Sequence, residues 1–173
     1  KGLFPTGLKD RVMRIYKKKY PEHKFVINDH RVFKPNKEVP NVKEIPLEGV
    51  TLRKHQVRAG NAMLKKKHGV LWAATNSGKT ETAIAVIKAL DLPTLFLVKG
   101  KDLVLQTYKR FQKRLGEEEI GLVMSNKWDV RKFTVASADT LARRLSPNKI
   151  GNNTHARQQA VKKLLGSVQV VIV

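Results

Sequence analysis

The chain has 173 residues, of which 41% are hydrophobic, and this suits about one globular domain with its own core. Its 35 lysines and arginines against 14 aspartates and glutamates give a net charge of +21, which favours a polyanion such as nucleic acid as partner over a merely well-solvated surface. The sequence has no cysteine, so no disulfide is expected. Its five histidines are scattered without the spacing of metal ligands, so no metal cluster is expected either. No apolar run approaches the roughly 20 residues of a membrane span, so a membrane partner is not expected.

Residues 1–48 are predicted to form part of a small α+β accessory module, with DNA binding as its expected role, followed by a linker. A helix is predicted between Thr6 and Pro21, and a strand over 23–29, before a proline-punctuated extended stretch. The helix contains "YKKKY", in which lysines could contact phosphates and tyrosines could stack on bases. The four-residue spacing of the tyrosines instead favours a place for them on the core face, with the lysines in water or on phosphate.

From residue 49 to residue 173 the pattern changes to helices that alternate with short apolar strands. Helices are predicted over 51–68, 79–90, 101–115, 139–145 and 156–166, and strands over 69–74, 94–98, 119–125, 133–137 and 168–173. Near-continuous apolar strands between helices predict an α/β domain with a parallel sheet and helices on both faces. Residues 146–155 are predicted to be a loop.

The stretch "AATNSGKT", residues 73–80, lies between a predicted strand and a predicted helix, which is the context of a phosphate-binding P-loop. Consecutive backbone N–H groups in such a loop surround phosphate oxygens, and the helix N-terminus adds partial positive charge. Lys79 would then contact the β- and γ-phosphates of ATP, and the Thr80 hydroxyl would bind Mg²⁺. The predicted nucleotide-binding residues of the loop are Ala73, Ala74, Thr75, Asn76, Ser77, Gly78, Lys79 and Thr80, with Lys79 and Thr80 in the catalytic role.

Two positions of this loop depart from the strict P-loop pattern. Ala73 stands where glycine is usual, and its small side chain fits if its backbone angles are ordinary. Asn76 is the non-glycine residue type that best tolerates the left-handed region, so it can hold a bend that a β-branched residue would break. One glycine, Gly78, is therefore expected to suffice.

The order of the segments 51–56, 73–80, 94–111, 135–141 and 168–173 resembles the first motor domain of superfamily 2 helicases, which has a RecA-like fold and belongs to the P-loop NTPases. It is most similar to the branch that holds phage UvsW-type helicases, XPB-type helicases and restriction-enzyme motor subunits. The resemblance covers about residues 50–173, and residues 1–8 resemble the segment that precedes the motor in this branch. It implies ATP and Mg²⁺ as cofactors. It also implies that Gln56, with Arg53 on the same helix, recognises the adenine edge.

The resemblance further implies which residues contact the nucleic-acid backbone. Lys99, Gly100 and Lys101 stand where the family often has Pro-Thr, so their charges and the Gly100 N–H would replace a hydroxyl contact. Ser137 and Thr140 match hydroxyl positions of the next motif, and Arg143 could add a phosphate contact or be solvated. Asp139 stands in place of a glutamine, and we expect it to cap the following helix instead.

The strand 168–173 resembles the one that leads into an Asp-Glu-x-His motif, which together with a second RecA-like domain of the same parent chain would complete hydrolysis. The 173 residues, which do not begin with Met, are thus expected to be a piece of a longer protein and nearly inactive alone. The implied function is an ATP-dependent DNA helicase, a monomer that remodels branched or duplex DNA in the cytoplasm of a bacterial or phage-infected cell, or in a nucleus. A restriction-type duplex translocase and an RNA helicase stay open. A nucleotide-binding kinase with the same loop would not explain Gln56. A basic nucleic-acid-binding module with an idle loop would not explain why Lys79 and Thr80 are intact.

Overall fold

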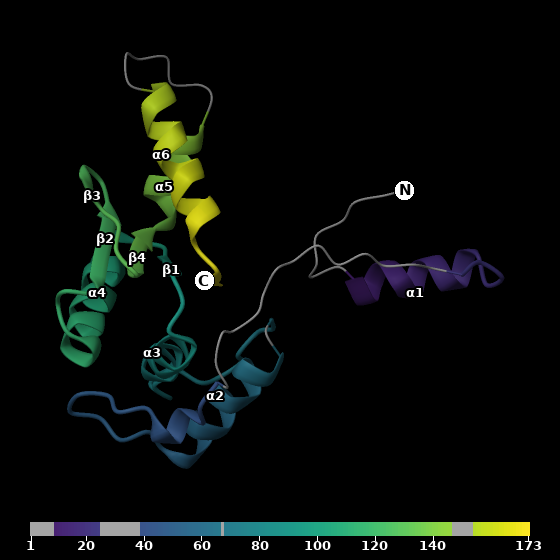
Figure 1. Ribbon diagram of the computed structural model, residues 1–173, viewed down its shortest axis with the longest axis horizontal. Helices are drawn as coiled ribbons and strands as arrows, with labels where there is room; N and C mark the ends of the chain where they lie inside the picture. The colour runs from purple at the N-terminus through teal and green to yellow at the C-terminus, as the bar shows by residue number, and fades with distance from the viewer. Residues whose placement is uncertain (1–8, 25–38, 67, 147–153) are drawn as a thin grey trace. The chain divides into compact units, whose positions relative to one another are not determined.

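The computed structural model describes residues 9–24, 39–66, 68–146 and 154–173 (Figure 1). The chain divides into two compact units, Lys1–Lys34 and Pro35–Val173. In the first unit, helix α1 spans Lys9–Lys19 and ends on three lysines. Most of the predicted strand 23–29 lies outside the described residues, and so do residues 1–8 and most of the predicted loop 146–155. Among the described helices, none combines the length and the apolar character that a membrane crossing needs.

The Pro35–Val173 unit is built on one five-stranded sheet with the strand order β3-β2-β4-β1-β5. The strands are β1 Thr94–Val98, β2 Ile120–Met124, β3 Lys127–Asp129, β4 Phe133–Ser137 and β5 Val170–Ile172. Strands β2, β4, β1 and β5 run parallel, while β3 returns antiparallel beside β2. The predicted α/β RecA-like fold is confirmed, and the sheet is mixed rather than wholly parallel because of β3, which the sequence did not predict.

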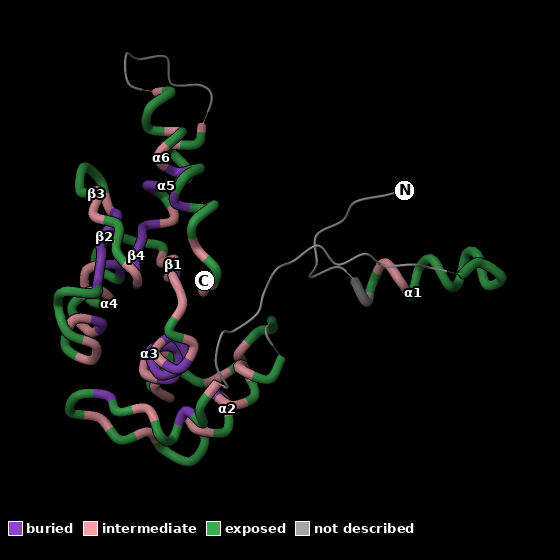
Figure 2. The backbone as a smooth tube through the Cα atoms, viewed as in Figure 1, coloured by how far each residue is buried: buried purple, intermediate pink, exposed green. Residues whose placement is uncertain are grey.

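Helices cover both faces of the sheet. They are α2 Lys54–Lys66, α3 Lys79–Leu90, α4 Lys101–Leu115, α5 Ala138–Leu145 and α6 Thr154–Ser167, with a short 3-10 helix η2 over Val42–Glu44. Alternate residues of each strand enter two separate cores, as the pleat of a strand requires. Val135 packs with residues of α3 and α4, while its neighbour Ala136 packs with residues of α5 and α6. Helix α3 has more buried residues than any other described helix, and Figure 2 shows it largely in the colour of buried residues.

The segment 69–74 is not a strand, so that prediction is wrong. Val70 is 94% exposed and Trp72 is 97% exposed, although both side chains are apolar. The physical reason is pairing: a strand is held by a neighbour's backbone, and none of the described strands pairs with this segment. Apolar composition alone therefore did not decide its conformation.

The stretch predicted as a linker contributes to the core of the Pro35–Val173 unit. Val42 is fully buried and Leu47 is 7% exposed, and both pack in the cluster that contains α3. The backbone N–H of Val42 donates to Oδ1 of Asn61 on α2 at 3.0 Å, and Asn61 Nδ2 donates to Oδ1 of Asn41 at 2.8 Å. These contacts fasten the stretch to α2.

Candidate nucleotide and nucleic-acid site

The loop 73–80 turns sharply before α3, and two left-handed residues produce the turn. Asn76 has φ 61°, the conformation predicted for it, and Gly78 has φ 79° as the N-cap of α3. The Ser77 N–H donates to the Ala74 carbonyl at 3.3 Å and closes the turn. Asparagine and glycine are the residue types that adopt this region at least cost, so the local sequence explains the local backbone.

Lys79, the first residue of α3, lies with its ammonium inside the loop. Its Nζ donates to the Ala73 carbonyl at 3.1 Å and to the Ala74 carbonyl at 2.8 Å. Its charge is therefore held at the helix N-terminus, where anions are favoured. The hydroxyl of Thr80, one residue later, makes no hydrogen bond to another described residue.

Gln56 of α2 lies directly beneath the loop and is 7% exposed. Its Nε2 donates to the Ser77 carbonyl at 3.2 Å and to the Gly78 carbonyl at 3.4 Å, while its Oε1 accepts from the Arg53 N–H at 2.7 Å. His55, which the sequence analysis did not select, also approaches the Ser77 carbonyl, with Nε2 at 3.1 Å. The structure thus brings His55 and Gln56 to the loop, and Arg53 meets Gln56 through its backbone N–H.

Two features of the loop fit a bound triphosphate. The Ser77 hydroxyl is buried and finds no hydrogen-bond partner among the described residues, which leaves its hydrogen-bonding capacity for a ligand. A Cβ on Gly78 would lie 2.0 Å from Gln56 Nε2, which shows that the backbone passes too close for a larger residue. The positive ammonium, the open Thr80 hydroxyl and the loop backbone are the groups that phosphate and Mg²⁺ bind.

Helix α3 is fixed on its other side by an ion pair. Glu81 follows Thr80, and its Oε2 accepts from Arg114 Nε of α4 at 3.1 Å, with both side chains largely buried. Arg114 also donates through NH1 to the Glu48 carbonyl at 2.6 Å. This clamp holds the phosphate loop helix against α4.

The predicted nucleic-acid residues follow two neighbouring strands at one edge of the sheet. Strand β1 pairs with β4 in parallel, with Val98 opposite Ser137. The residues that follow these two positions, Lys99 to Lys101 after β1 and Ala138 onward after β4, therefore leave the sheet side by side. Lys99, Gly100 and Lys101 are exposed, and Gly100 has φ 90° as the N-cap of α4. This places two lysines at a helix N-terminus at the carboxyl edge of the sheet.

The hydroxyls of the second motif are used within the fold. Ser137 is 5% exposed and caps α5, with Oγ accepting from the Thr140 N–H at 3.2 Å. Thr140 is 3% exposed, and its Oγ1 accepts from the Ser125 N–H at 3.0 Å. The expectation that Asp139 caps this helix is wrong: Ser137 is the cap, and Asp139 lies in the first turn, where its charge suits the helix dipole. Arg143 is exposed one turn later.

Comparison with known proteins places this geometry in a family. Residues 49–173 match the profile of the type III restriction enzyme res subunit. The chain belongs to this family. It is similar to the DNA 3'-5' translocase XPB2 of Sulfurisphaera tokodaii, at 30% identity over 53% of the chain and 20% of that protein. It is also similar to the UvrABC system protein B of Staphylococcus aureus, at 32% over 56% of the chain and 13% of that protein.

The chain is also similar to the UvrABC system protein B of Campylobacter fetus, at 43% identity over 32% of the chain and 8% of that protein. The chain therefore spans a fifth or less of the length of these relatives. The matched region 49–173 contains all the predicted nucleotide-binding residues and the motif residues predicted to contact the nucleic-acid backbone, whereas the accessory module 1–48 lies outside it. Together with the sheet order, this identifies the first RecA-like motor domain of the superfamily 2 type, as predicted.

Proposed function

We propose that the chain is the ATP-binding motor domain of an ATP-dependent DNA helicase or translocase. The observation that carries this proposal is the loop 73–80, with the Lys79 ammonium inside it and α3 behind it. Family membership and the net charge of +21 support DNA as the polymer.

In this proposal the loop backbone and Lys79 hold the phosphates of ATP, and Thr80 with the phosphates holds Mg²⁺. Bound ATP supplies a phosphoanhydride whose cleavage changes the contacts that the loop makes. Gln56 and Arg53 lie on the adenine side. Because both ends of the Gln56 amide already bond backbone atoms, its contact with the loop supports a role in transmitting the presence of the base to Ser77 and Gly78.

The nucleic acid would run along the carboxyl edge of the sheet, past Lys99, Gly100 and Lys101. Exposed lysines and a helix N-terminus bind phosphates and give little sequence preference. A second RecA-like domain of the same parent chain would complete the ATP site. Unwinding or branch migration of branched or duplex DNA, by a monomer in the cytoplasm or nucleus, is the finer form of the proposal.

The test is nucleotide binding to the protein and to its Lys79→Ala variant. We expect the variant to lose ATP affinity at least tenfold, because the ammonium group that lies inside the loop is removed. Lys109→Ala, which removes an exposed charge on α4, serves as the matched control and should bind ATP like the original. Equal ATP binding by Lys79→Ala would contradict the nucleotide site.

The motor part of the proposal is tested on the complete parent protein. ATP hydrolysis should accelerate when DNA is added, and the acceleration should decline steeply with salt because phosphate contacts release counterions. A parent protein that binds nucleic acid but neither binds nor hydrolyses ATP would favour the basic module with an idle loop, and one that binds ATP without any response to nucleic acid would contradict the motor.

A further inference from the structure

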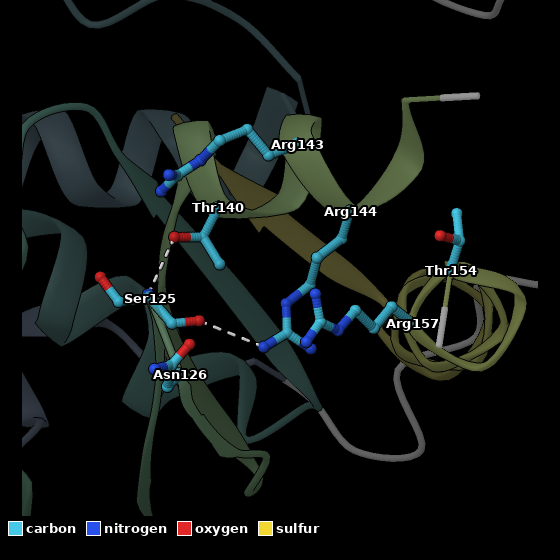
Figure 3. Close-up of a pocket in the computed structure, with 7 residues that line it drawn as sticks. All are labelled: Ser125, Asn126, Thr140, Arg143, Arg144, Thr154 and Arg157. Atoms are coloured by element: carbon cyan, nitrogen blue, oxygen red, sulfur yellow. Dashed lines mark hydrogen bonds between the residues drawn. The ribbon is translucent and has the colours of Figure 1, made fainter. Parts of the chain in front are cut away.

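A second pocket lies away from the phosphate loop, between α5, α6 and the turn that joins β2 to β3. Its volume is about 210 Å³, and one water occupies about 30 Å³ in the liquid, so a phosphate group fits with hydration. Arg143 and Arg144 reach it from α5, and Arg157 reaches it from α6. Figure 3 shows the side chains of Arg144 and Arg157 extending toward one another across the pocket, with Ser125 at its other side.

The pocket concentrates positive charge without an acidic partner. Its lining contains three arginines and no carboxylate. The ion pairs found in the described part of the chain involve other cations, at Arg110, Arg114, Arg131 and Lys132, and not these three arginines. Neighbouring guanidinium groups repel one another, so the arrangement is unfavourable unless an anion joins them.

Arg144 is oriented in advance, whereas Arg143 is held on its own helix and Figure 3 shows its side chain extending away from those of Arg144 and Arg157. The Arg144 guanidinium carbon lies 4.4 Å from the centre of the Trp128 ring, and its NH2 donates to the Ser125 carbonyl at 3.2 Å. Arg143 Nε donates to the Asp139 carbonyl at 3.2 Å. Burial lowers the pKa of the Arg144 guanidinium from its ordinary value, and repulsion by Arg157 lowers it further. Groups that are already oriented lose little entropy when a ligand binds.

The place of the pocket in the fold indicates the kind of anion. The pocket residues follow the carboxyl ends of β2 and β4, the same sheet edge at which Lys99 to Lys101 follow β1. The pocket therefore lies at the same edge of the sheet as the candidate nucleic-acid residues, and no residue of the loop 73–80 lines it. Arginine forks fit the oxygens of a phosphate better than any other side chain does.

We propose that Arg144 and Arg157, with Arg143 at the rim, form a pocket that binds one backbone phosphate of the nucleic-acid strand. This inference rests on the proposed function, because it requires that a nucleic-acid strand binds at this edge of the sheet. It adds a specific contact from α6, a helix outside the predicted motifs. The same chemistry would accept free inorganic phosphate, and the experiment separates the two sources.

The experiment measures binding of a labelled single-stranded DNA by fluorescence anisotropy over a series of salt concentrations. Arg157→Ala is the main variant, because Arg157 is exposed and makes no hydrogen bond or ion pair with another described residue, so its loss should leave the fold intact. Arg157→Lys keeps the charge and loses the fork. Lys163→Ala removes an exposed charge from the same helix, outside the pocket, and is the matched control.

We expect Arg157→Ala to weaken DNA binding about fivefold and to reduce the slope of log affinity against log salt by about 0.7, the value for one single-strand phosphate. Arg157→Lys should recover the slope and only part of the affinity, and Lys163→Ala should change neither. Equal effects of Arg157→Ala and Lys163→Ala would overturn the pocket while leaving the motor proposal in place.

Calorimetric titration with potassium phosphate is the second experiment. If Arg157→Ala lost phosphate binding without any change in DNA binding, the pocket would be assigned to free phosphate. If the unaltered protein bound no DNA, both this inference and the DNA part of the proposed function would fall.

Discussion

The Gln56 side-chain amide donates a hydrogen bond of 3.2 Å to the backbone carbonyl of Ser77, 21 residues later in the chain. The oxygen of the same amide accepts a hydrogen bond from the N–H of Arg53, the residue before α2. Gln56 therefore connects the start of α2 to the phosphate loop. Removal of one partner of a buried hydrogen bond leaves the other unsatisfied, which costs about 1 to 3 kcal/mol. The loop shape thus depends on a residue outside the loop.

Replacement of Gln56 by Ala distinguishes support of the loop from recognition of adenine. If Gln56 mainly supports the loop, Gln56→Ala should weaken ATP and GTP binding to the same extent, by about tenfold, since the phosphate cradle is shared. If it reads adenine, only the preference for ATP should be lost. We expect the first result, from titration with both nucleotides. Gln159→Ala, at an exposed position of α6, is the control and should leave both affinities unchanged.

Asn76 has a positive φ of 61°, which makes side-chain branching at this position costly. Asn76→Gly should bind ATP as the original does. Asn76→Val should lower the free energy of unfolding by about 1 to 2 kcal/mol and weaken ATP binding, because a β-branched residue is strained in this region. Thr75→Val, next to it and without a positive φ, is the matched control. Equal behaviour of the two valine variants in denaturant unfolding would show that the backbone angle is not the constraint.

The pair of Glu81 and Arg114 is predicted to stabilise the domain more than an exposed pair does. Their side chains are 14% and 12% exposed, whereas those of Asp129 and Arg131 are 30% and 41% exposed. A double-mutant cycle of Glu81→Ala and Arg114→Ala should give a coupling of about 2 kcal/mol, and the cycle for the exposed pair should give less than about 1 kcal/mol.

Arg114→Ala should also cost more than Glu81→Ala, because Arg114 bonds the Glu48 carbonyl as well. Denaturant unfolding of the single and double variants measures all of these quantities. Coupling energies of equal size in the two cycles would show that burial does not strengthen the Glu81–Arg114 pair.

The sequence predicted the elements whose signals are local. Helices α3 and α4 begin and end at the predicted residues, and four of the five strands predicted between residues 49 and 173 are present, because their apolar runs lie between clear helix boundaries. The bend at Asn76 was also predictable, since it depends on one residue's own backbone preference. Local patterns thus determined most of the fold and the loop.

Most of the failures depend on which other residue or strand a residue pairs with, rather than on its own preference. The segment 69–74 has strand composition but no described neighbour, and β3 has only three residues and depends on pairing with β2. The approach of Arg157 to Arg144 depends on how α6 packs on α5, which no spacing in the sequence reveals. Asp139 was expected to cap α5, but this helix begins at Ala138, before Asp139. The side chain of Ser137 is therefore the better-placed acceptor for the cap.

Gly60 of α2 tests whether the residues before position 49 belong to the folded domain. A Cβ at Gly60 would lie 2.9 Å from Val42 Cγ2, closer than packed atoms allow. Alanine within a helix is favoured over glycine by about 1 kcal/mol, but an extra methyl group in a packed core costs about 1 to 3 kcal/mol. We therefore expect Gly60→Ala to destabilise the protein by about 1 kcal/mol.

On a Val42→Ala background the close contact between residues 42 and 60 is relieved, and Gly60→Ala should become stabilising. Thermal or denaturant unfolding of the four variants gives both signs. Stabilisation by Gly60→Ala on both backgrounds would mean that Val42 does not pack on α2 in solution, and that the stretch before residue 49 is a linker after all.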